Sequence, residues 1–246
     1  MNTLVCSLQG RFGNQCLQYL FARAWCERHG YTLLVEPWIG ERVFQLDDKR
    51  PWPSAASPAM TLSDRELASV DGRMQAEDLG YRGYAQMQCC VDYYTKRQAQ
   101  AWLRVRPELL KWCGRHPGVD TTVAHRRVGD YIGYGYPVVS EVAYIKACLQ
   151  FGLHAEALRF VTEETQETCG LPDDLLFVPD FVRLMQAPTL LRGNSSFSWL
   201  AGLLGNGLVL SPVIDGLEGG KEHDCRFVPG NWPRFANLDF VTDLHV

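Results

Sequence analysis

The chain has 246 residues, enough to bury the core of one large domain or of two small ones. Its composition, 46% hydrophobic and 21% charged, is that of a globular protein, and its net charge of −4 argues against a general nucleic-acid-binding protein. No apolar run is long enough to span a membrane. The first residues resemble a short strand and not a signal peptide, so we expect a cytoplasmic protein with no transmembrane segment.

The nine cysteines form no CxxC pair, and many of them have apolar neighbours. Zinc sites need clustered ligands at short spacing, and the sequence contains no such cluster. We therefore expect reduced, mostly buried thiols and no bound metal.

The N-terminal residues predict a strand, a glycine-bounded turn and a helix. The strand covers residues 3–8 and is followed by the turn. Apolar residues at spacings of three and four then predict a helix over about 14–29, with Asn14 at or near its N-cap and Gly30 after its last turn. Residues 31–35 form a second strand. This order is typical of an α/β fold.

The middle of the chain is less regular. Residues 61–69 predict a short helix, residues 80–94 fit either a strand or a buried helix, and residues 96–112 predict one amphipathic helix. The segment 96–127 carries eight Lys/Arg against two acidic residues. A solvated helix face explains most of this charge, and only the last two arginines have a position that favours function.

Strands and helices alternate more regularly from about residue 119. We predict strands over 121–125, 158–162, 175–178, 189–191 and 208–211, and helices over 141–151, 180–185 and 196–204. Repeated βα units of this length imply a parallel sheet covered by helices. The sequence thus predicts two small α/β domains facing a cleft, one over residues 1–115 and the other over 116–246.

Arg127 is the strongest candidate for a functional residue. It follows the strand over 121–125 and lies close to Gly129. A guanidinium in such a place can donate two parallel hydrogen bonds to a phosphate. A sugar-nucleotide transferase must stabilise a departing diphosphate with a metal or with fixed cations, and no DxD-type motif lies in a suitable loop. The alternative is a structural ion pair between Arg127 and Asp130.

His125 precedes Arg127 by two residues, so the two side chains should lie on the same face of the strand. His125 could position a phosphate or hold a loop carbonyl, and a purely structural histidine is an equally good interpretation. Asp130 is better suited to accept hydrogen bonds from loop N–H groups than to act as a base.

Two further segments place polar groups at helix starts. In residues 10–15 (GRFGNQ), two glycines allow close approach of the backbone, and Asn14 and Gln15 lie where N–H groups would face an anion. Residues 194–199 (NSSFSW) offer the same arrangement, and Phe197 could wall a base or a sugar. Simple capping by the serines is the alternative.

GRFGNQ, His-x-Arg-x-Gly-Asp-Tyr (residues 125–131) and NSSFSW, in this order, resemble the motifs of the α-1,2-fucosyltransferase family and of its superfamily, which includes α-1,6- and protein O-fucosyltransferases. Residues 160–164 resemble the family's strand that ends in a Ser-Asp-Asp-like triplet, and residues 180–185 resemble its Asp-Phe-x-x-Leu-Met segment. The resemblance covers residues 3–30 and about 120–213.

This resemblance implies a GT-B-like fold with two facing Rossmann-like domains, the N-terminal one small. It also implies inverting, metal-independent transfer of L-fucose from GDP-fucose to a hydroxyl of a glycan or of a lipid-linked saccharide. By position, Arg127 would contact the β-phosphate and His125 the nucleotide beside it. The other donor-binding residues would be Arg11, Phe12, Gly13, Asn14 and Gln15 for sugar and pyrophosphate, Ser195, Ser196 and Phe197 for phosphate, and Asp180 for guanine or ribose.

The chain departs from the family at two points: Val128 stands in place of the second arginine, and the triplet is Thr-Glu-Glu. Asp130, Glu163 and Glu164 are the candidate general bases, and a dissociative route with weak base assistance is an alternative. Two other functions stay open. One is transfer of another sugar from a nucleotide donor, and the other is a non-catalytic GDP-sugar-binding protein of the same fold.

Overall fold

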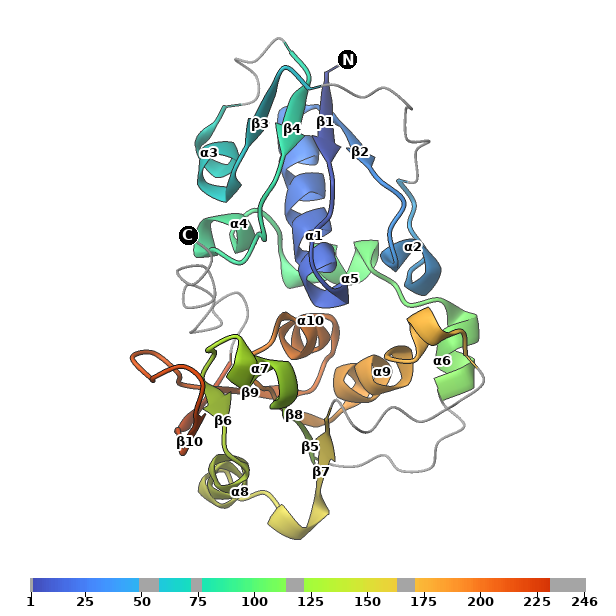
Figure 1. Cartoon of the computed structure of the whole chain (residues 1–246). Coiled ribbons are helices and arrows are strands. Elements are labelled where there is room, and N and C mark those ends of the chain that lie inside the picture. Colours follow the sequence, from blue (N-terminus) through green and yellow to red (C-terminus); the bar gives the residue numbers. More distant parts are fainter. Residues whose placement is uncertain (1, 49–57, 72–76, 114–121, 163–170, 231–246) are drawn as a thin grey trace. The chain divides into compact units, whose positions relative to one another are not determined.

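The computed structural model describes residues 2–48, 58–71, 77–113, 122–162 and 171–230, and the chain divides into two units (Figure 1). Unit 1 runs to Arg104, and unit 2 begins at Val105. This division lies before the boundary expected at residue 115, which is itself outside the described residues. The reason is that helix α6 (Pro107–Cys113) packs against α9 (Val178–Gln186) of unit 2. No helix in the described residues is both long and apolar enough to cross a membrane.

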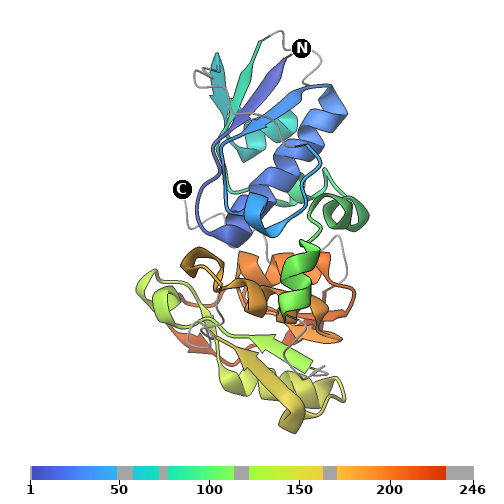
Figure 2. The same cartoon turned by 90° about the vertical axis from the view of Figure 1, so that its right-hand side faces the viewer.

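Unit 1 is built on a four-stranded parallel sheet with the spatial order β2-β1-β4-β3. Its strands are β1 (Thr3–Cys6), β2 (Thr32–Val35), β3 (Met60–Leu62) and β4 (Leu79–Tyr81). Because all four strands run in the same direction, their carboxyl ends meet at one edge of the sheet. Figure 2 shows the long helix α1 (Phe12–His29) along one face of this sheet.

Helix α1 begins two residues earlier than predicted. Gly10 has a φ of 76°, a left-handed conformation that glycine adopts without strain, and the helix starts at Phe12 with Arg11 as its N-cap. Asn14, predicted at or near the N-cap, lies inside the first turn, three residues after Arg11. The predicted end of the helix is confirmed, because Gly30 adopts the left-handed conformation with a φ of 75°.

The short helices of unit 1 are α2 (Gly40–Val43), α3 (Asp64–Ser69), α4 (Gln88–Val91) and α5 (Lys96–Trp102). The helix predicted over 61–69 begins late, because Ser63 and Glu66 form a capping box and the residues before Ser63 belong to β3. Residues 80–94 contain both of the alternatives considered, the end of β4 and the helix α4.

The single helix predicted over 96–112 is in fact two, α5 and α6. Pro107 opens α6, and a proline disfavours the helical conformation in the residue before it. Thr95 begins α5 with a capping box, in which its hydroxyl accepts a hydrogen bond from the backbone N–H of Gln98 at 3.2 Å.

Unit 2 contains a five-stranded sheet with the order β11-β9-β8-β5-β7. The strands are β5 (Thr122–His125), β7 (Leu158–Val161), β8 (Thr189–Leu191), β9 (Leu208–Pro212) and β11 (Phe227–Pro229). All pairings are parallel except that of β11 with β9. A separate parallel pair joins β6 (Val138–Val139) to β10 (Glu222–His223). No element was predicted after Asp215, yet this segment supplies β10 and β11.

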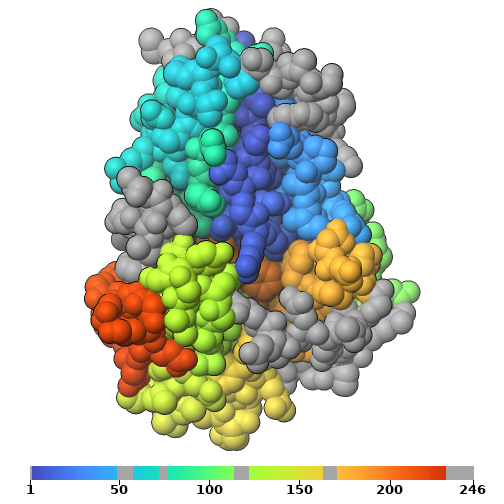
Figure 3. All heavy atoms as spheres, viewed as in Figure 1, coloured from blue at the N-terminus to red at the C-terminus, as the bar shows by residue number. Residues whose placement is uncertain are grey.

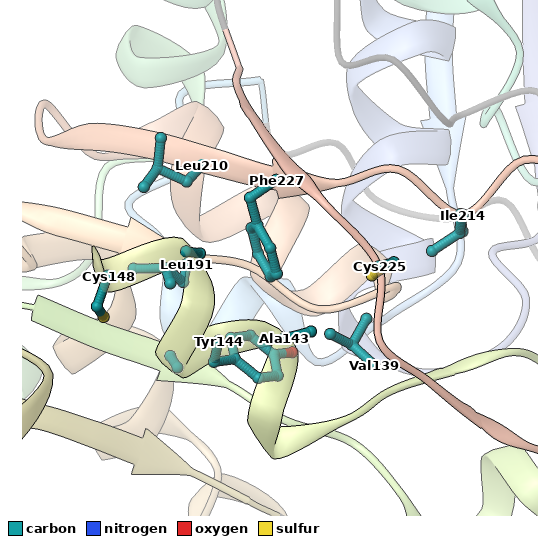
Figure 4. Packing of buried hydrophobic residues seen from close by; sticks show 11 residues of the cluster. Val139, Ala143, Tyr144, Cys148, Leu191, Leu210, Ile214, Cys225 and Phe227 are labelled. Atoms are coloured by element: carbon teal, nitrogen blue, oxygen red, sulfur yellow. The ribbon is translucent and has the colours of Figure 1, made fainter. Parts of the chain in front are cut away.

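Helices cover both faces of this sheet (Figure 1). The helical elements besides α6 and α9 are α7 (Gly129–Gly133), α8 (Glu141–Gln150), α10 (Ser196–Leu204), η2 (Ala155–Ala157) and η3 (Asp173–Leu175). On one face, Tyr144 of α8 packs into a buried apolar cluster with Leu191, Leu210 and Phe227 (Figure 4). On the other face, α10 lies so close that a Cβ on Gly202 would be 3.0 Å from Val209.

The strand predicted over 175–178 is wrong, because η3 and the start of α9 occupy these residues. A proline in the first turn of α9 fits a helix start and could not donate a ladder hydrogen bond within a strand. Leu175 and Val178 of this run are buried, and a short apolar run does not distinguish a strand from a helix.

Candidate functional site: the carboxyl edge of the sheet in unit 2

The polar residues of unit 2 that the sequence singled out follow adjacent strands at one edge. His125 ends β5, the segment Arg192–Ser195 follows the neighbouring β8, and α10 begins immediately afterwards. The carboxyl edge of a parallel sheet next to a helix N-terminus is where α/β proteins commonly bind anions. Figure 3 shows the α7 segment, which follows β5, at the surface of unit 2 beside the red segment that carries β10.

Arg127 forms a bidentate ion pair with Asp130. Its Nε donates to Oδ1 of Asp130 at 2.9 Å and its Nη2 to Oδ2 at 2.6 Å. The guanidinium also lies over the ring of Tyr131, with 4.6 Å between its central carbon and the ring centroid. The structural ion pair considered for Arg127 is therefore present. A bound anion would have to share the guanidinium with Asp130 or displace the Asp130 carboxylate. Both oxygens of Asp130, one of the candidate general bases, therefore accept hydrogen bonds from Arg127.

His125 is a neutral, buried side chain. Burial, with a smaller contribution from Arg127, lowers the pKa of His125 to about 3. Its backbone carbonyl accepts a hydrogen bond from the Tyr144 hydroxyl at 2.7 Å, whereas its Nδ1 has no hydrogen-bond partner among the described residues. Gly193 allows the close approach of the next loop, since a Cβ there would lie 2.6 Å from the same carbonyl oxygen. His125 can therefore offer a ligand a neutral hydrogen bond, but not a positive charge.

Ser195 and Phe197 bring the start of α10 to His125 and α7. The hydroxyl of Ser195 accepts a hydrogen bond from the backbone N–H of Phe197 at 3.3 Å, so the capping interpretation holds. Burial raises the pKa of Tyr131. The positive charge of Arg127 and a hydrogen bond with Ser195 partly offset this rise. The ring of Phe197 lies 5.5 Å from that of His125. Ser196 is the first residue of α10.

Asp180 lies in the first turn of α9 and is buried. Its neighbour Phe181 contacts the ring of Phe197 at 5.5 Å, and α9 packs against both α10 and β5. The structure therefore places Asp180 on a helix that borders the same edge.

Two arginines at this edge were not recognised as site residues. Arg192 follows β8 and is almost fully buried; its Nε donates to Oγ of Ser211 at 2.6 Å, and burial lowers its pKa to about 10. Arg126, whose position directly after β5 was noted in the sequence, pairs with Glu222 of β10 at 2.8 Å. The sequence signal for Arg192 was a charged residue directly after a predicted strand, which did not stand out among 24 Lys and Arg.

The remaining predicted donor-binding residues belong to unit 1, at the turn between β1 and α1. Arg11 is exposed, while Phe12 is buried and stacks on Phe44 with 5.7 Å between ring centroids. Gly13 is buried in the first turn of α1, followed by Asn14 and Gln15. Phe12 is thus part of the core of unit 1, whereas Arg11 is accessible to a ligand.

The candidate bases Glu163 and Glu164 lie outside the described residues. Within the described residues, no group of three or more His, Cys, Asp or Glu side chains is arranged to hold a metal ion.

No family model and no curated protein matches this sequence. Solved structures do match. NodZ α-1,6-fucosyltransferase soaked with GDP-fucose gives a TM-score of 0.59 at 14% identity, over 94% of this chain and 100% of the other. Fucosyltransferase NodZ from Bradyrhizobium gives 0.56 at 13% identity with the same coverage. A mutant of Arabidopsis thaliana FUT1 in complex with GDP gives 0.50 at 9% identity, over 85% of this chain and 70% of the other. The expected α/β fold with two parallel sheets, similar to GT-B fucosyltransferases, is confirmed.

Proposed function

We propose that this protein is an inverting, metal-independent glycosyltransferase that moves L-fucose from GDP-fucose to a hydroxyl of a glycan or of a lipid-linked saccharide. The observation that carries the proposal is the cluster of Arg127, His125 and the Ser195-capped start of α10 at one sheet edge, in a chain with the fold of fucosyltransferase structures. The motif resemblance favours an α-1,2 linkage.

The chemistry required is stabilisation of a departing nucleoside diphosphate. Arg127 would supply charge-assisted hydrogen bonds to the leaving phosphate, and the backbone N–H groups at the start of α10 would add fixed dipoles. Val128, in place of the family's second arginine, is the N-cap residue of α7. We propose that Arg192, buried at the same edge, adds the second positive charge. Above pH 4 His125 is neutral and would hydrogen-bond the nucleotide.

The Arg127–Asp130 ion pair favours a second candidate, a protein that binds a GDP-sugar without turning it over. A carboxylate that occupies one edge of the guanidinium reduces the charge available to a leaving group. In a transferase, Asp130 instead orients Arg127 and gives way to the phosphate when the donor binds.

The deciding experiment is calorimetric titration of the protein with GDP, GDP-fucose and GDP-mannose in EDTA, with GDP release followed in the same samples. A transferase slowly hydrolyses its donor without an acceptor, so we expect tight binding of GDP-fucose and slow release of GDP. A repeat with excess Mg²⁺ should leave the rate unchanged, and a strict requirement for a divalent ion would contradict the metal-free mechanism.

The other outcomes identify the alternatives. Binding of GDP-fucose with no GDP release, also after addition of a glycan mixture, would support the binding protein. Equal binding and hydrolysis of GDP-mannose would indicate another sugar donor. Absence of binding by all three nucleotides would overturn the proposed function and leave the likeness to fucosyltransferases as one of fold.

A further inference from the structure

The turn between β1 and α1 in unit 1 is held by a glutamine whose amide oxygen and nitrogen are both hydrogen-bonded to the backbone. Gln18 is buried; its Oε1 accepts from the backbone N–H of Gln9 at 2.8 Å, and its Nε2 donates to the carbonyl oxygens of Gln9 at 2.8 Å and Asn14 at 3.1 Å. Both ends of the amide therefore bond to the backbone. Such an amide has a structural role, since a buried polar group left without partners costs free energy.

A second buried glutamine, Gln86, reaches the same turn from a distant part of the chain. Its Nε2 donates to Oδ1 of Asn14 at 2.8 Å, and its side chain is only 3% exposed. Gln86 lies between β4 and α4, and Figure 1 shows this segment and the start of α1 at the same end of the sheet. The contact thus joins the turn to a region that the motif resemblance does not cover.

The segment before Gln86 is fixed by a buried carboxylate. Asp64 accepts hydrogen bonds from the Tyr81 hydroxyl at 2.6 Å and from the backbone N–H groups of Tyr84 and Ala85 at 3.0–3.2 Å. Ala85 is held at a φ of 53°, and it is the only non-glycine residue with positive φ in the described part of the chain. A non-glycine residue keeps this conformation only where the surrounding contacts hold it, and such residues cluster at ligand sites.

Two amide oxygens at this turn differ from that of Gln18. Oε1 of Gln86 and Oε1 of Gln15 are both buried, and neither has a hydrogen-bond partner among the described residues. The nitrogen of each amide is engaged, Gln86 with Asn14 and Gln15 with the carbonyl oxygen of Gly10 at 2.9 Å. Each amide oxygen therefore lacks a hydrogen-bond donor, and it can accept from an O–H or an N–H group.

We infer that Gln86, together with Gln15, forms a subsite for the hydroxyl groups of a sugar at the β1–α1 turn. The inference rests on the proposed function, which supplies a sugar on the donor and another on the acceptor. Two neutral acceptor oxygens suit hydroxyl donors and not phosphate, which carries only acceptor oxygens at neutral pH. Gln86 is then a specificity-determining residue, and its position depends on its bond with Asn14 and on the segment that Asp64 holds.

The test compares Gln86→Met, which keeps the length of the side chain and removes both polar atoms, with the wild type. Gln88→Met is the matched control, because Gln88 lies two residues further on and its Nε2 bonds the exposed Asp92. The dissociation constants of GDP and GDP-fucose are measured by calorimetry, and the glycan preference is measured on a glycan array in the presence of GDP. Thermal unfolding checks the fold, and Gln15→Met replaces Gln86→Met if the latter lowers the melting temperature markedly.

We expect Gln86→Met to bind GDP as the wild type does and to lose about 10-fold in affinity for one sugar-bearing ligand, which is the size of one lost hydrogen bond. Loss on GDP-fucose assigns the subsite to the donor sugar, and loss on array glycans assigns it to the acceptor. A folded variant that retains both affinities overturns the inference, as does a wild-type protein that binds neither ligand. If the wild type binds glycans but no nucleotide, the proposed function fails, and the array still tests the subsite.

Discussion

The two units present the same kind of edge with different sets of side chains. In both, parallel strands end beside the start of a helix, α1 in unit 1 and α10 in unit 2. The edge in unit 2 carries charged side chains, with Arg127 paired to Asp130 and Arg192 buried nearby. The edge in unit 1 carries the exposed Arg11 and three neutral amides, Asn14, Gln15 and Gln86.

One architecture can thus serve two types of ligand. A helix start beside a sheet edge offers the same backbone groups in either unit. Guanidinium groups add what a phosphate needs, whereas amide oxygens add what a hydroxyl group needs. The side chains at the edge, and not the fold, therefore decide the ligand.

The largest effect should come from removing the positive charge of Arg127 in unit 2. We expect Arg127→Ala to lower the rate of GDP-fucose turnover by about 1,000-fold or more, because the leaving phosphate loses charge-assisted hydrogen bonds. The measurement is release of GDP under saturating donor, with circular dichroism as a check on the fold. The matched control is Arg226→Ala, an exposed arginine of the same unit, which should retain full activity. Near-full activity in Arg127→Ala would remove Arg127 from the mechanism.

In unit 1, we expect the largest effect from a substitution of Asp64. It should lower the free energy of unfolding and leave nucleotide binding unchanged. Asp64→Asn places an NH₂ group or a weaker acceptor opposite donors that now bond a carboxylate, and hydrogen bonds to charged groups contribute about 1.5–3 kcal/mol. We expect a loss of about 2–3 kcal/mol in the free energy of unfolding, measured with urea. Asp92→Asn, at an exposed position of the same region, should change it by less than about 0.5 kcal/mol. Equal stabilities of the two variants would show that Asp64 does not fix the segment.

The sequence allowed prediction of the architecture of unit 2 because its elements have strong local patterns. The helix over 196–204 was predicted with its observed bounds, and Gly30 marked the end of α1 as predicted. The failures follow from competing local chemistry: Pro107 splits one amphipathic pattern into two helices, and Gly10 moves the start of α1 ahead of Asn14. Neither effect changes the hydrophobic periodicity on which the predictions relied.

The sequence allowed prediction of the local contacts of the candidate site residues but not of their long-range contacts. Arg127 and Asp130 are three residues apart, so their pairing could be considered from the sequence alone. The contact of Gln86 with Asn14 joins residues 72 positions apart, and no local pattern signals it. Arg192 is equally hidden, because its burial depends on the packing of β8 against β9 and not on its neighbours in sequence.

His125 gives the edge of unit 2 a dependence on pH. The pKa of His125 is about 3 in the folded protein and about 6.5 in an unfolded chain, so the unfolded state binds more protons between these values. Stability should therefore fall as the pH drops below 6.5, by about 1.4 kcal/mol per pH unit from this group. The measurement is urea unfolding at pH 7.5 and at pH 5.

His125→Gln should lessen this loss by about 2 kcal/mol at pH 5, because glutamine does not titrate. His154→Gln is the control, since His154 is exposed and its removal should leave the dependence as in the wild type. An unchanged pH dependence in His125→Gln would mean that the histidine is protonated without cost, and the neutral role assigned to it would fail.

The smallest expected effect tests whether the amide edge depends on a strained backbone. Ala85 has a φ of 53°, which costs an alanine about 1 kcal/mol relative to glycine, whereas glycine gains freedom in the unfolded chain worth about 0.4–1 kcal/mol. Ala85→Gly should therefore raise the free energy of unfolding by between zero and about 0.6 kcal/mol. Ala99→Gly, inside α5, should lower it by about 1 kcal/mol or more, because there the conformation suits alanine. A loss of equal size in both variants would show that the conformation at Ala85 stores no strain. Gln86 would then owe its position to its bond with Asn14 and to Asp64 alone.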